Sequence, residues 1–262
     1  TAQSMFTNFA NVSESARRNP PFGIAQMGRC FRNEITTGNF IFRSREFEIA
    51  ELEYFVKPGT DEAWFEKWLT DWEAFFIDDL KISKEHIRHY EHPKEGLAHY
   101  SKRTVDLEYN FPFGWGEIAG VANRTDYDLK RHTEFSKQEL SVFEEATKTS
   151  YVPYVIEPTL GIDRAFVTCL INHYEEIKGG RTTTTESNKE AEVVLHLPPA
   201  LAPYKVAVLP LSKKEPLTTL AKEVVATLRN HWQCAYDEVA SIGRRYRRHD
   251  EIGTPYCVTV DF

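Results

Sequence analysis

The stretch F-R-N-E-I-T-T-G-N-F-I-F-R-S-R-E-F-E, residues 31–48, sets three arginines and three glutamates among four phenylalanines. It contains the end of one segment with strand character, Phe22–Glu34, and the start of another, Phe42–Val56, with a T-T-G-N turn at 36–39 between them. The second segment is ambiguous, because the propensities of residues 47–53 suit a helix equally well. The stretch therefore predicts two paired strands around a short turn.

The charged side chains of these segments indicate either a solvated sheet edge or a nucleotide site. On a pleated strand, Arg43 and Arg45 would share one face with Glu51 and Glu53. A solvated edge has such a composition. Arginines interleaved with aromatic residues also suit a nucleotide, because guanidinium groups bind phosphate and an aromatic face stacks on a base. The sequence contains no glycine-rich phosphate loop that would do this instead.

Two further clusters contain residue types that bind phosphate or metal. In E-P-T-L-G-I-D-R, residues 157–164, a carboxylate ends a predicted strand and Arg164 falls in the first turn of the next helix. In F-P-F-G-W-G-E-I-A-G, residues 111–120, glycines would let the backbone approach a ligand. Glu117 is the natural acidic group there for Mg²⁺ beside phosphates. Surface positions are favoured over a metal site for the histidines His86, His89, His92 and His99.

The composition is that of a folded protein with one large domain or two smaller ones. The 262 residues carry a net charge of −7, and 41% of them are hydrophobic, which suffices for a sizeable core. No apolar run approaches the ~20 residues of a membrane helix, and the N-terminus lacks the features of a signal peptide. Four isolated cysteines predict a reducing cytoplasm. The acidic balance argues against unspecific coating of nucleic acid, but a local basic patch could still dock RNA.

A polar stretch divides the chain into two parts. Residues 178–192 contain no aromatic residue and predict a solvated loop or linker. The expected boundaries are a front domain of residues 1–177, a linker of residues 178–200 and a back domain of residues 201–262. In the back domain, the strand–helix–strand order predicts a small α/β unit from Lys205–Pro210, Thr218–Asn230 and Tyr256–Phe262.

The front domain shows one clear helical pattern. Asp61–Leu80 is predicted to be a helix whose aromatic stripe, Trp64, Trp68 and Trp72, packs in the core. Further along, residues 151–157 predict a strand. Pro158–Gly161 is expected to turn the chain into a helix that ends near His173.

Taken in order, these clusters resemble the class II aminoacyl-tRNA synthetases, and among them the dimeric glycyl-tRNA synthetases. An isolated F-R-x-E motif would be weak, but the order of motifs is specific and covers nearly the whole chain. The resemblance implies an α/β (α+β) fold, with an antiparallel catalytic sheet and helices before a small α/β anticodon-binding domain. The matching segments are residues 1–3, 21–26, 31–35, 40–48, 99–102, 114–117, 124–129, 157–164, 201–203, 206–210, 242–248 and 250–255.

The resemblance implies an ATP site with two catalytic arginines. Arg32 would hold the α-phosphate, and Arg164 with Arg43 or Arg45 would clamp the outer phosphates of a bent ATP, with Mg²⁺ held by Glu117. Catalysis would then consist of positioning and charge stabilisation. The implied ATP-binding residues are Arg32, Asn33, Glu34, Phe42, Arg43, Ser44, Arg45, Glu46, Phe47, Glu117, Ile118, Gly161, Ile162, Asp163 and Arg164.

The resemblance also assigns groups to adenine and to glycine. Glu34 would meet the adenine amino group, and Phe47 would stack on the base. The ammonium group of glycine would meet carboxylates, namely Glu48 or Glu51 together with Glu157. A small acidic pocket would exclude larger amino acids sterically. The implied glycine-binding residues are Phe47, Glu48, Ile49, Ala50, Glu51, Glu157, Pro158, Thr159, Leu160 and Gly161.

The implied activity is that of a glycine–tRNA ligase, which makes glycyl-adenylate from ATP and transfers glycine to tRNA(Gly) in cytoplasmic translation. The family forms homodimers through segments outside this sequence, and no membrane is involved. A run of arginines in the back domain is typical of a solvated face when considered alone. With the resemblance, contact to tRNA becomes the better interpretation of Arg244, Arg245, Arg247 and Arg248.

Some family features are absent or changed. The acidic residue that normally precedes Thr1, the first motif and the C-terminal end lie outside the sequence, so we expect the isolated chain to be inactive or weakly active. The alternative is a non-enzymatic synthetase-like module that binds RNA or protein, such as a polymerase accessory subunit. Retention of the ATP arginines argues against it. The changed positions, which gather where glycine is expected to bind, are Ile49, Ala50, Ala119, Asn123 and Thr159.

Overall fold

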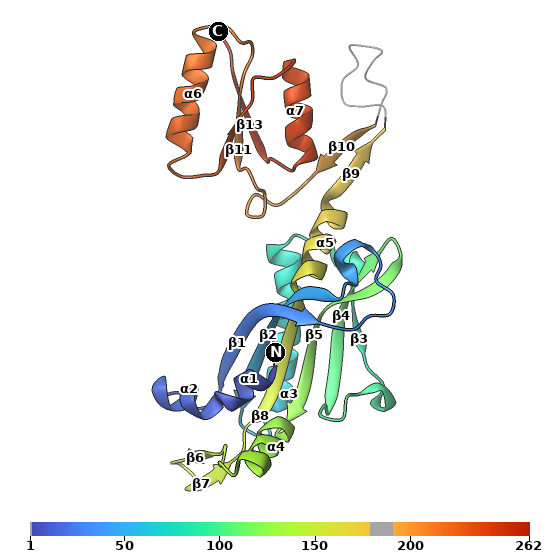
Figure 1. The fold of residues 1–262 in the computed structure, drawn as a ribbon, viewed down its shortest axis with the longest axis vertical. Helices are drawn as coiled ribbons and strands as arrows, with labels where there is room; N and C mark the ends of the chain where they lie inside the picture. The colour runs from blue at the N-terminus through green and yellow to red at the C-terminus, as the bar shows by residue number, and fades with distance from the viewer. Residues whose placement is uncertain (1, 179–190) are drawn as a thin grey trace. The chain divides into compact units, whose positions relative to one another are not determined.

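The computed structural model describes residues 2–178 and 191–262 (Figure 1). The chain separates into two compact units, Thr1–Thr168 and Cys169–Phe262. The predicted α/β architecture with an antiparallel sheet is confirmed. Most of the predicted linker lies outside the described residues. Within the described ranges, no helix is long and apolar enough to cross a membrane.

An antiparallel sheet forms the centre of the first unit. In the described residues its strand order is β1-β2-β8-β5-β4-β3, so strands far apart in sequence become neighbours (Figure 1). The central strand β8 lies between β2 and β5, which brings the second predicted cluster beside the other two. In sheet order the strands are Phe22–Phe31, Glu46–Val56, Tyr154–Gly161, Gly114–Thr125, Arg103–Phe111 and Ile87–Glu91.

The first pair of strands is confirmed, but the position predicted for two arginines is wrong. Residues Phe40–Phe42 form a 3₁₀ turn, η1, and both Asn39 and Phe40 have positive φ angles. This turn breaks the pleat, so β2 begins only at Glu46. Arg43 and Arg45 therefore lie in the turn region and do not share a strand face with Glu51 and Glu53.

The turn predicted at Pro158–Gly161 is also wrong, because these residues belong to β8. Proline has no N–H to donate to a neighbouring strand. The structure accommodates it by an interruption in the β2–β8 register, between the pairs Glu51↔Thr159 and Tyr54↔Ile156. The strand continues through the interruption and leads directly into helix α5, Ile162–His173, whose predicted end near His173 is confirmed.

One face of this sheet is covered by the predicted tryptophan helix. Helix α3, Asp61–Ala74, continues as the π-helical turn η2, Phe75–Asp79, as predicted for 61–80. Buried Phe65 and Leu69 contact the sheet cluster around Val56. Half-buried tryptophans pack against the same cluster, which confirms their core role: Trp64, Trp68 and Trp72.

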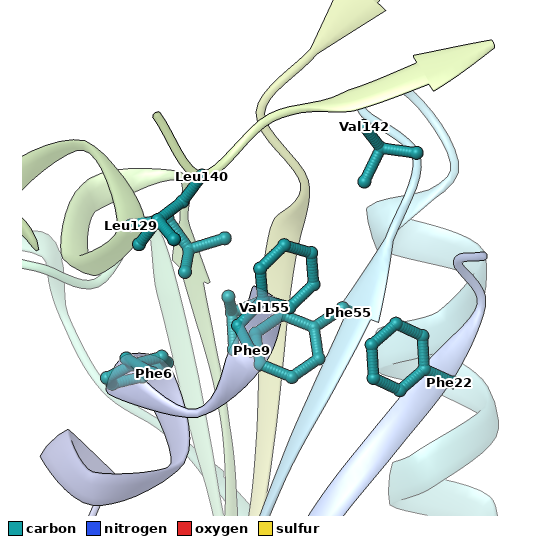
Figure 2. Packing of buried hydrophobic residues seen from close by; sticks show 8 residues of the cluster. All are labelled: Phe6, Phe9, Phe22, Phe55, Leu129, Leu140, Val142 and Val155. Atoms are coloured by element: carbon teal, nitrogen blue, oxygen red, sulfur yellow. The ribbon is translucent and has the colours of Figure 1, made fainter. Parts of the chain in front are cut away.

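The opposite face carries an aromatic cluster at one end (Figure 2). Helices α1, Ala2–Thr7, and α2, Phe9–Ser15, supply Phe6 and Phe9, which lie against Phe55 of β2. Helix α4, Tyr127–Ser136, and the hairpin of β6, Val142–Glu144, and β7, Thr149–Tyr151, complete the cluster. Glu51 and Glu53 of β2 lie on the same face as Phe55, beside this cluster. The connection between α3 and β4 also contains the short turns η3, Lys84–His86, and η4, Lys94–Gly96.

The second unit contains a small parallel sheet, which confirms the predicted α/β organisation. Among the described residues its strand order is β12-β11-β13, and helices α6 and α7 accompany it. Strand β10, Glu192–Leu195, pairs with β9, Tyr174–Ile177, although residues 178–200 were predicted to be a linker. The apolar run Val193–Leu195 explains this pairing. The other bounds are β11 Val206–Pro210, α6 Leu217–Leu228, β12 Cys234–Tyr236, α7 Ile242–Glu251 and β13 Tyr256–Val260.

Candidate active site

A pocket in the first unit gathers side chains from all three predicted clusters. The η1 turn, the start of β2, strand β5 and the β8–α5 junction each contribute to its wall. Most of the residues predicted to bind ATP therefore lie around one space. The lining residues are Arg32, Glu34, Ile41, Phe42, Arg43, Ser44, Phe47, Glu48, Ile49, Glu117, Ile118, Ala119, Thr159, Gly161, Asp163 and Arg164.

Arg164 links the three clusters by direct contacts. Its Nη1 donates to the backbone oxygen of Glu117 at 2.9 Å and to the Glu117 carboxylate at 2.8 Å. Its Nε donates to the Phe42 carbonyl at 3.2 Å, and the guanidinium carbon lies 4.5 Å from the centre of the Phe42 ring. The side chain is thus held from both sides, in a geometry suited to binding phosphate oxygens.

The other arginines contact Glu34 and Phe47, two further residues of the pocket wall. Arg43 donates to the Glu34 carboxylate at 3.2 Å, and Arg45 donates to the Glu34 carbonyl at 2.9 Å. The guanidinium carbon of Arg32 lies 5.5 Å from the centre of the Phe47 ring. Arg43 lines the pocket and Arg45 does not, which favours Arg43 as the phosphate ligand of the two.

A second pocket adjoins the first and contains the predicted glycine carboxylates. The two pockets share Arg32 and Thr159 in their linings. Glu51 and Glu157 line the second pocket. Glu48 lies three residues before Glu51, so its side chain points to the opposite face of β2. Its backbone N–H donates to the Asp163 carboxylate at 2.7 Å. This arrangement favours Glu51 over Glu48 as the partner of Glu157.

Behind the second pocket lies a buried charge network that we did not predict from the sequence. Arg124 Nη1 contacts both oxygens of Glu157 at 2.9 Å, and its Nε and Nη2 bind Asp128 at 2.8 and 3.0 Å. The Arg124 guanidinium also lies 3.8 Å from the centre of the Tyr100 ring. The i, i+4 spacing of Arg124 and Asp128 was the available signal. The network fixes Glu157 at the edge of the pocket.

The surroundings of Glu117 fit a metal ion bound chiefly through phosphate. Among the described residues no cluster of three or more His, Cys, Asp or Glu side chains is arranged to hold a metal. Glu117 is half-exposed and pairs with Arg164, while Asp106 lies near it. Burial, and then the charge of Glu117, raises the pKa of Asp106. Mg²⁺ usually binds one or two carboxylates together with substrate phosphates and water, and this part of the site offers that ligand set.

Several predicted residues do not line the first pocket. Two of them, Glu51 and Glu157, line the second pocket. Ala50 and Pro158 instead line an apolar hollow beside Trp68. Their roles in binding remain predictions. The residues absent from the lining are Asn33, Arg45, Glu46, Ile162, Ala50, Glu51, Glu157, Pro158 and Leu160.

In the second unit, the prediction that Arg245 contacts tRNA is wrong. Its side chain is 2% exposed, because it donates to the backbone carbonyls of Pro210 and Ala240 on the inside of α7. Arg248 pairs with Asp237. Residues 244–248 span more than one full turn of helix, so at least one of them faces the core. The accessible members of the run are Arg244, Arg247 and Arg248.

Sequence comparisons identify the family to which both units correspond. The tRNA synthetase class II core domain (G, H, P, S and T) matches residues 3–174, and the anticodon binding domain matches residues 205–262. The chain belongs to the class II tRNA synthetases. The first pocket of this synthetase chain therefore lies within its core domain.

Relatives and solved structures agree with this membership. The glycine–tRNA ligases of Thermobifida fusca and Bifidobacterium longum are 53% and 54% identical to the whole chain, which covers 56% and 54% of them. The synthetase chain thus spans about half the length of these curated relatives. A prolyl-tRNA synthetase from Cryptosporidium parvum, solved with L-proline and AMP, superposes with a TM-score of 0.70 at 17% identity over 99% of this chain and 52% of its own. That likeness shows the fold.

Gly116 is expected to be essential for the shape of the first pocket. A Cβ atom at this position would lie 2.6 Å from Cζ of Phe42, the ring that packs on Arg164. Gly116→Ala should therefore displace Phe42 and Arg164 and weaken ATP binding about 10- to 100-fold. Titration calorimetry with ATP measures this loss. Gly28→Ala is the control, because nothing lies within 4 Å of its added Cβ. Equal ATP affinities in wild type and Gly116→Ala would contradict the expectation.

Proposed function

We propose that this chain forms the ATP- and glycine-binding part of a glycine–tRNA ligase. The observation that carries the proposal is the joining of two pockets, one with three arginines for phosphate and one with Glu51 and Glu157 for an ammonium group. The 53% identity to a glycine–tRNA ligase supports the same assignment. ATP, glycine, Mg²⁺ and tRNA(Gly) are the ligands of the proposed enzyme.

The reaction proceeds in two steps. The carboxylate of glycine attacks the α-phosphate of ATP, the bond to the β-phosphate breaks, and pyrophosphate leaves behind glycyl-adenylate. A terminal ribose hydroxyl of tRNA then attacks the glycyl carbonyl, and AMP leaves. Arg32 and Arg164 stabilise the charge that develops on the phosphate in the first step. Glu117 would hold Mg²⁺, which supplies further neutralisation of the phosphate charge.

Selection of glycine is assigned to the groups that would surround its α-carbon within the second pocket. An ammonium group held between Glu51 and Glu157 leaves its α-carbon close to Thr159 and the backbone of β5, which pairs Gly120 with Thr159. A side chain on the α-carbon would have to displace these groups. Steric exclusion of this kind distinguishes the smallest substrate from every larger one.

The second unit of the proposed enzyme binds tRNA. A hollow lined by Tyr204, Arg229, His231 and Trp232 offers cationic and aromatic groups for unpaired bases, in addition to Arg244. All four cysteines are free thiols, which agrees with the proposal that the enzyme acts in the reducing cytoplasm. Assembly as a homodimer stays a prediction.

Amino-acid-dependent ATP–pyrophosphate exchange tests the proposal. The assay uses the longest form of the protein that contains these 262 residues. Glycine should stimulate exchange at least about 100-fold more than alanine or serine, because a pocket that excludes side chains sterically can discriminate by such a factor. Stimulation by alanine or serine instead would mean that Ala50, Ala119 and Thr159 have reshaped the pocket. The absence of exchange with every amino acid, in a folded protein, would contradict the proposed function and favour a non-enzymatic module.

A further inference from the structure

Glu53 is a buried carboxylate without a role in the proposed site. It lies on β2 with 0% of its surface exposed. In the part of the chain that the structure describes, neither of its carboxylate oxygens meets a hydrogen-bond donor. Burial of an ionised carboxylate without a partner is costly. The ionisation state of Glu53 therefore requires a physical explanation.

The register of the sheet sets Glu53 against Glu157. Strands β2 and β8 pair at Glu51↔Thr159 and again three residues further along β2, which leaves Glu53 opposite Glu157 in the interrupted part of the ladder. Residues that face each other on neighbouring antiparallel strands point to the same side of the sheet. Two ionised carboxylates in such a position repel each other. If one of them carries a proton, the same contact becomes a hydrogen bond.

The charges around Glu53 indicate which carboxylate holds that proton. The groups that face it are Glu157 from β8, Arg124 from β5, Asp128 from α4 and Glu51 on β2 itself. Arg124 directs its hydrogen bonds to Glu157 and Asp128. Burial, and then the charge of Glu157, raises the pKa of Glu53 well above its usual range. Burial also raises the pKa of Glu157, but Arg124 stabilises the ionised form of Glu157 by two hydrogen bonds and its charge, whereas it acts on Glu53 through its charge alone. Glu53 is therefore the better holder of the proton.

We propose that Glu53 is protonated at neutral pH and donates a hydrogen bond to Glu157, and thereby acts as a positioning residue for the carboxylate that receives the amino group of the substrate. This role rests on the proposed function. Arg124 and Glu53 hold Glu157 from two elements, and Glu157 reaches the second pocket with 9% of its surface exposed. With Glu53 uncharged, Glu51, Glu157, Asp128 and Arg124 sum to a charge of −2, one negative charge fewer than with Glu53 ionised, and a substrate ammonium reduces it to −1.

Infrared difference spectroscopy tests the protonation directly and without any substrate. The spectrum of wild type minus Glu53→Gln, recorded in D₂O at neutral pH, should contain the carbonyl stretch of a protonated carboxylic acid. Glu144→Gln is the matched control, because Glu144 pairs with Lys57 outside both pockets and its loss should leave this band in place. A difference spectrum without the band would overturn the proposal, whatever amino acid the enzyme activates.

Exchange kinetics test the positioning role. Glu53→Gln retains an uncharged donor, whereas Glu53→Met fills the space without one. We expect the KM for glycine to change less than about threefold in Glu53→Gln but to rise about 10- to 100-fold in Glu53→Met, the factor for a lost hydrogen bond to a charged group. The KM for ATP should be unchanged in both variants. A wild-type glycine KM in Glu53→Met, or equal damage in the two variants, would overturn the role. If Glu53→Met does not fold, Glu53→Gln and the infrared band decide. If no amino acid supports exchange, the proposed function fails while the infrared result still stands.

Discussion

Replacement of Arg32 by alanine is expected to lower glycine-dependent ATP–pyrophosphate exchange by about 10²- to 10³-fold, the usual cost of one transition-state donor. Arg32 lines both pockets, so its guanidinium reaches the place where the carboxylate of glycine would meet the α-phosphate. Its loss removes a charge that becomes important only as the pentavalent phosphate forms. The fall should therefore lie mainly in kcat, with a smaller change in the KM for ATP.

The control for Arg32→Ala is Arg29→Ala, three residues earlier in the chain and within β1. Arg29 is exposed and pairs with Glu46 at 2.7 Å, and it lines neither pocket. Exchange by Arg29→Ala should remain close to that of wild type. Thermal unfolding of the two variants should also be alike, because both side chains lie at the surface. Exchange by Arg32→Ala within about threefold of wild type would contradict the role that Arg32 has in this site.

The sequence predicted the elements with a strong local pattern. The tryptophans at i, i+4 spacing predicted helix α3. The helix that follows Gly161 was predicted from its place directly after residues 158–161. The pocket residues could be predicted because motif order and residue type carried the resemblance. Neither the local spacing of residues nor the order of motifs depends on how distant segments pack. Both signals can therefore be detected in one sequence without a structure.

The errors arose where tertiary structure overrides local pattern. Alternation along an assumed strand placed Arg43 on the face of Glu51, but the 3₁₀ turn at Phe40–Phe42 interrupts the pleat. Glu53 was compatible with a solvated edge, because the sequence does not show that Glu157 and Arg124 lie around it. Arg245 was one charge in a basic run, and only the packing of α7 reveals that it points inward. In each case the deciding neighbour lies far away in sequence.

Replacement of Arg124 by methionine is expected to lower the free energy of unfolding of the first unit by about 3–5 kcal/mol, the cost of breaking a buried ion pair. Arg124 is 5% exposed, and its loss would leave Glu157 and Asp128 buried without a cation. Methionine fills much of the space of the arginine side chain, so the loss of stability comes mainly from the missing positive charge and less from a cavity. Thermal denaturation followed by circular dichroism measures the loss. Arg131→Met is the control, because its exposed pair with Glu134 should be worth less than about 1 kcal/mol.

The sign of the pH dependence separates this electrostatic cost from a packing defect. In Arg124→Met, the unpaired carboxylates have a pKa in the folded state that is raised above its value in the unfolded state. The folded form then binds more protons, so stability is gained as the pH falls toward the unfolded-state value of about 4. The deficit of Arg124→Met relative to wild type should therefore shrink between pH 7 and pH 5. A deficit that stays constant with pH would assign the loss to packing, and a variant as stable as wild type would show that Glu157 needs no buried cation to hold it at the pocket.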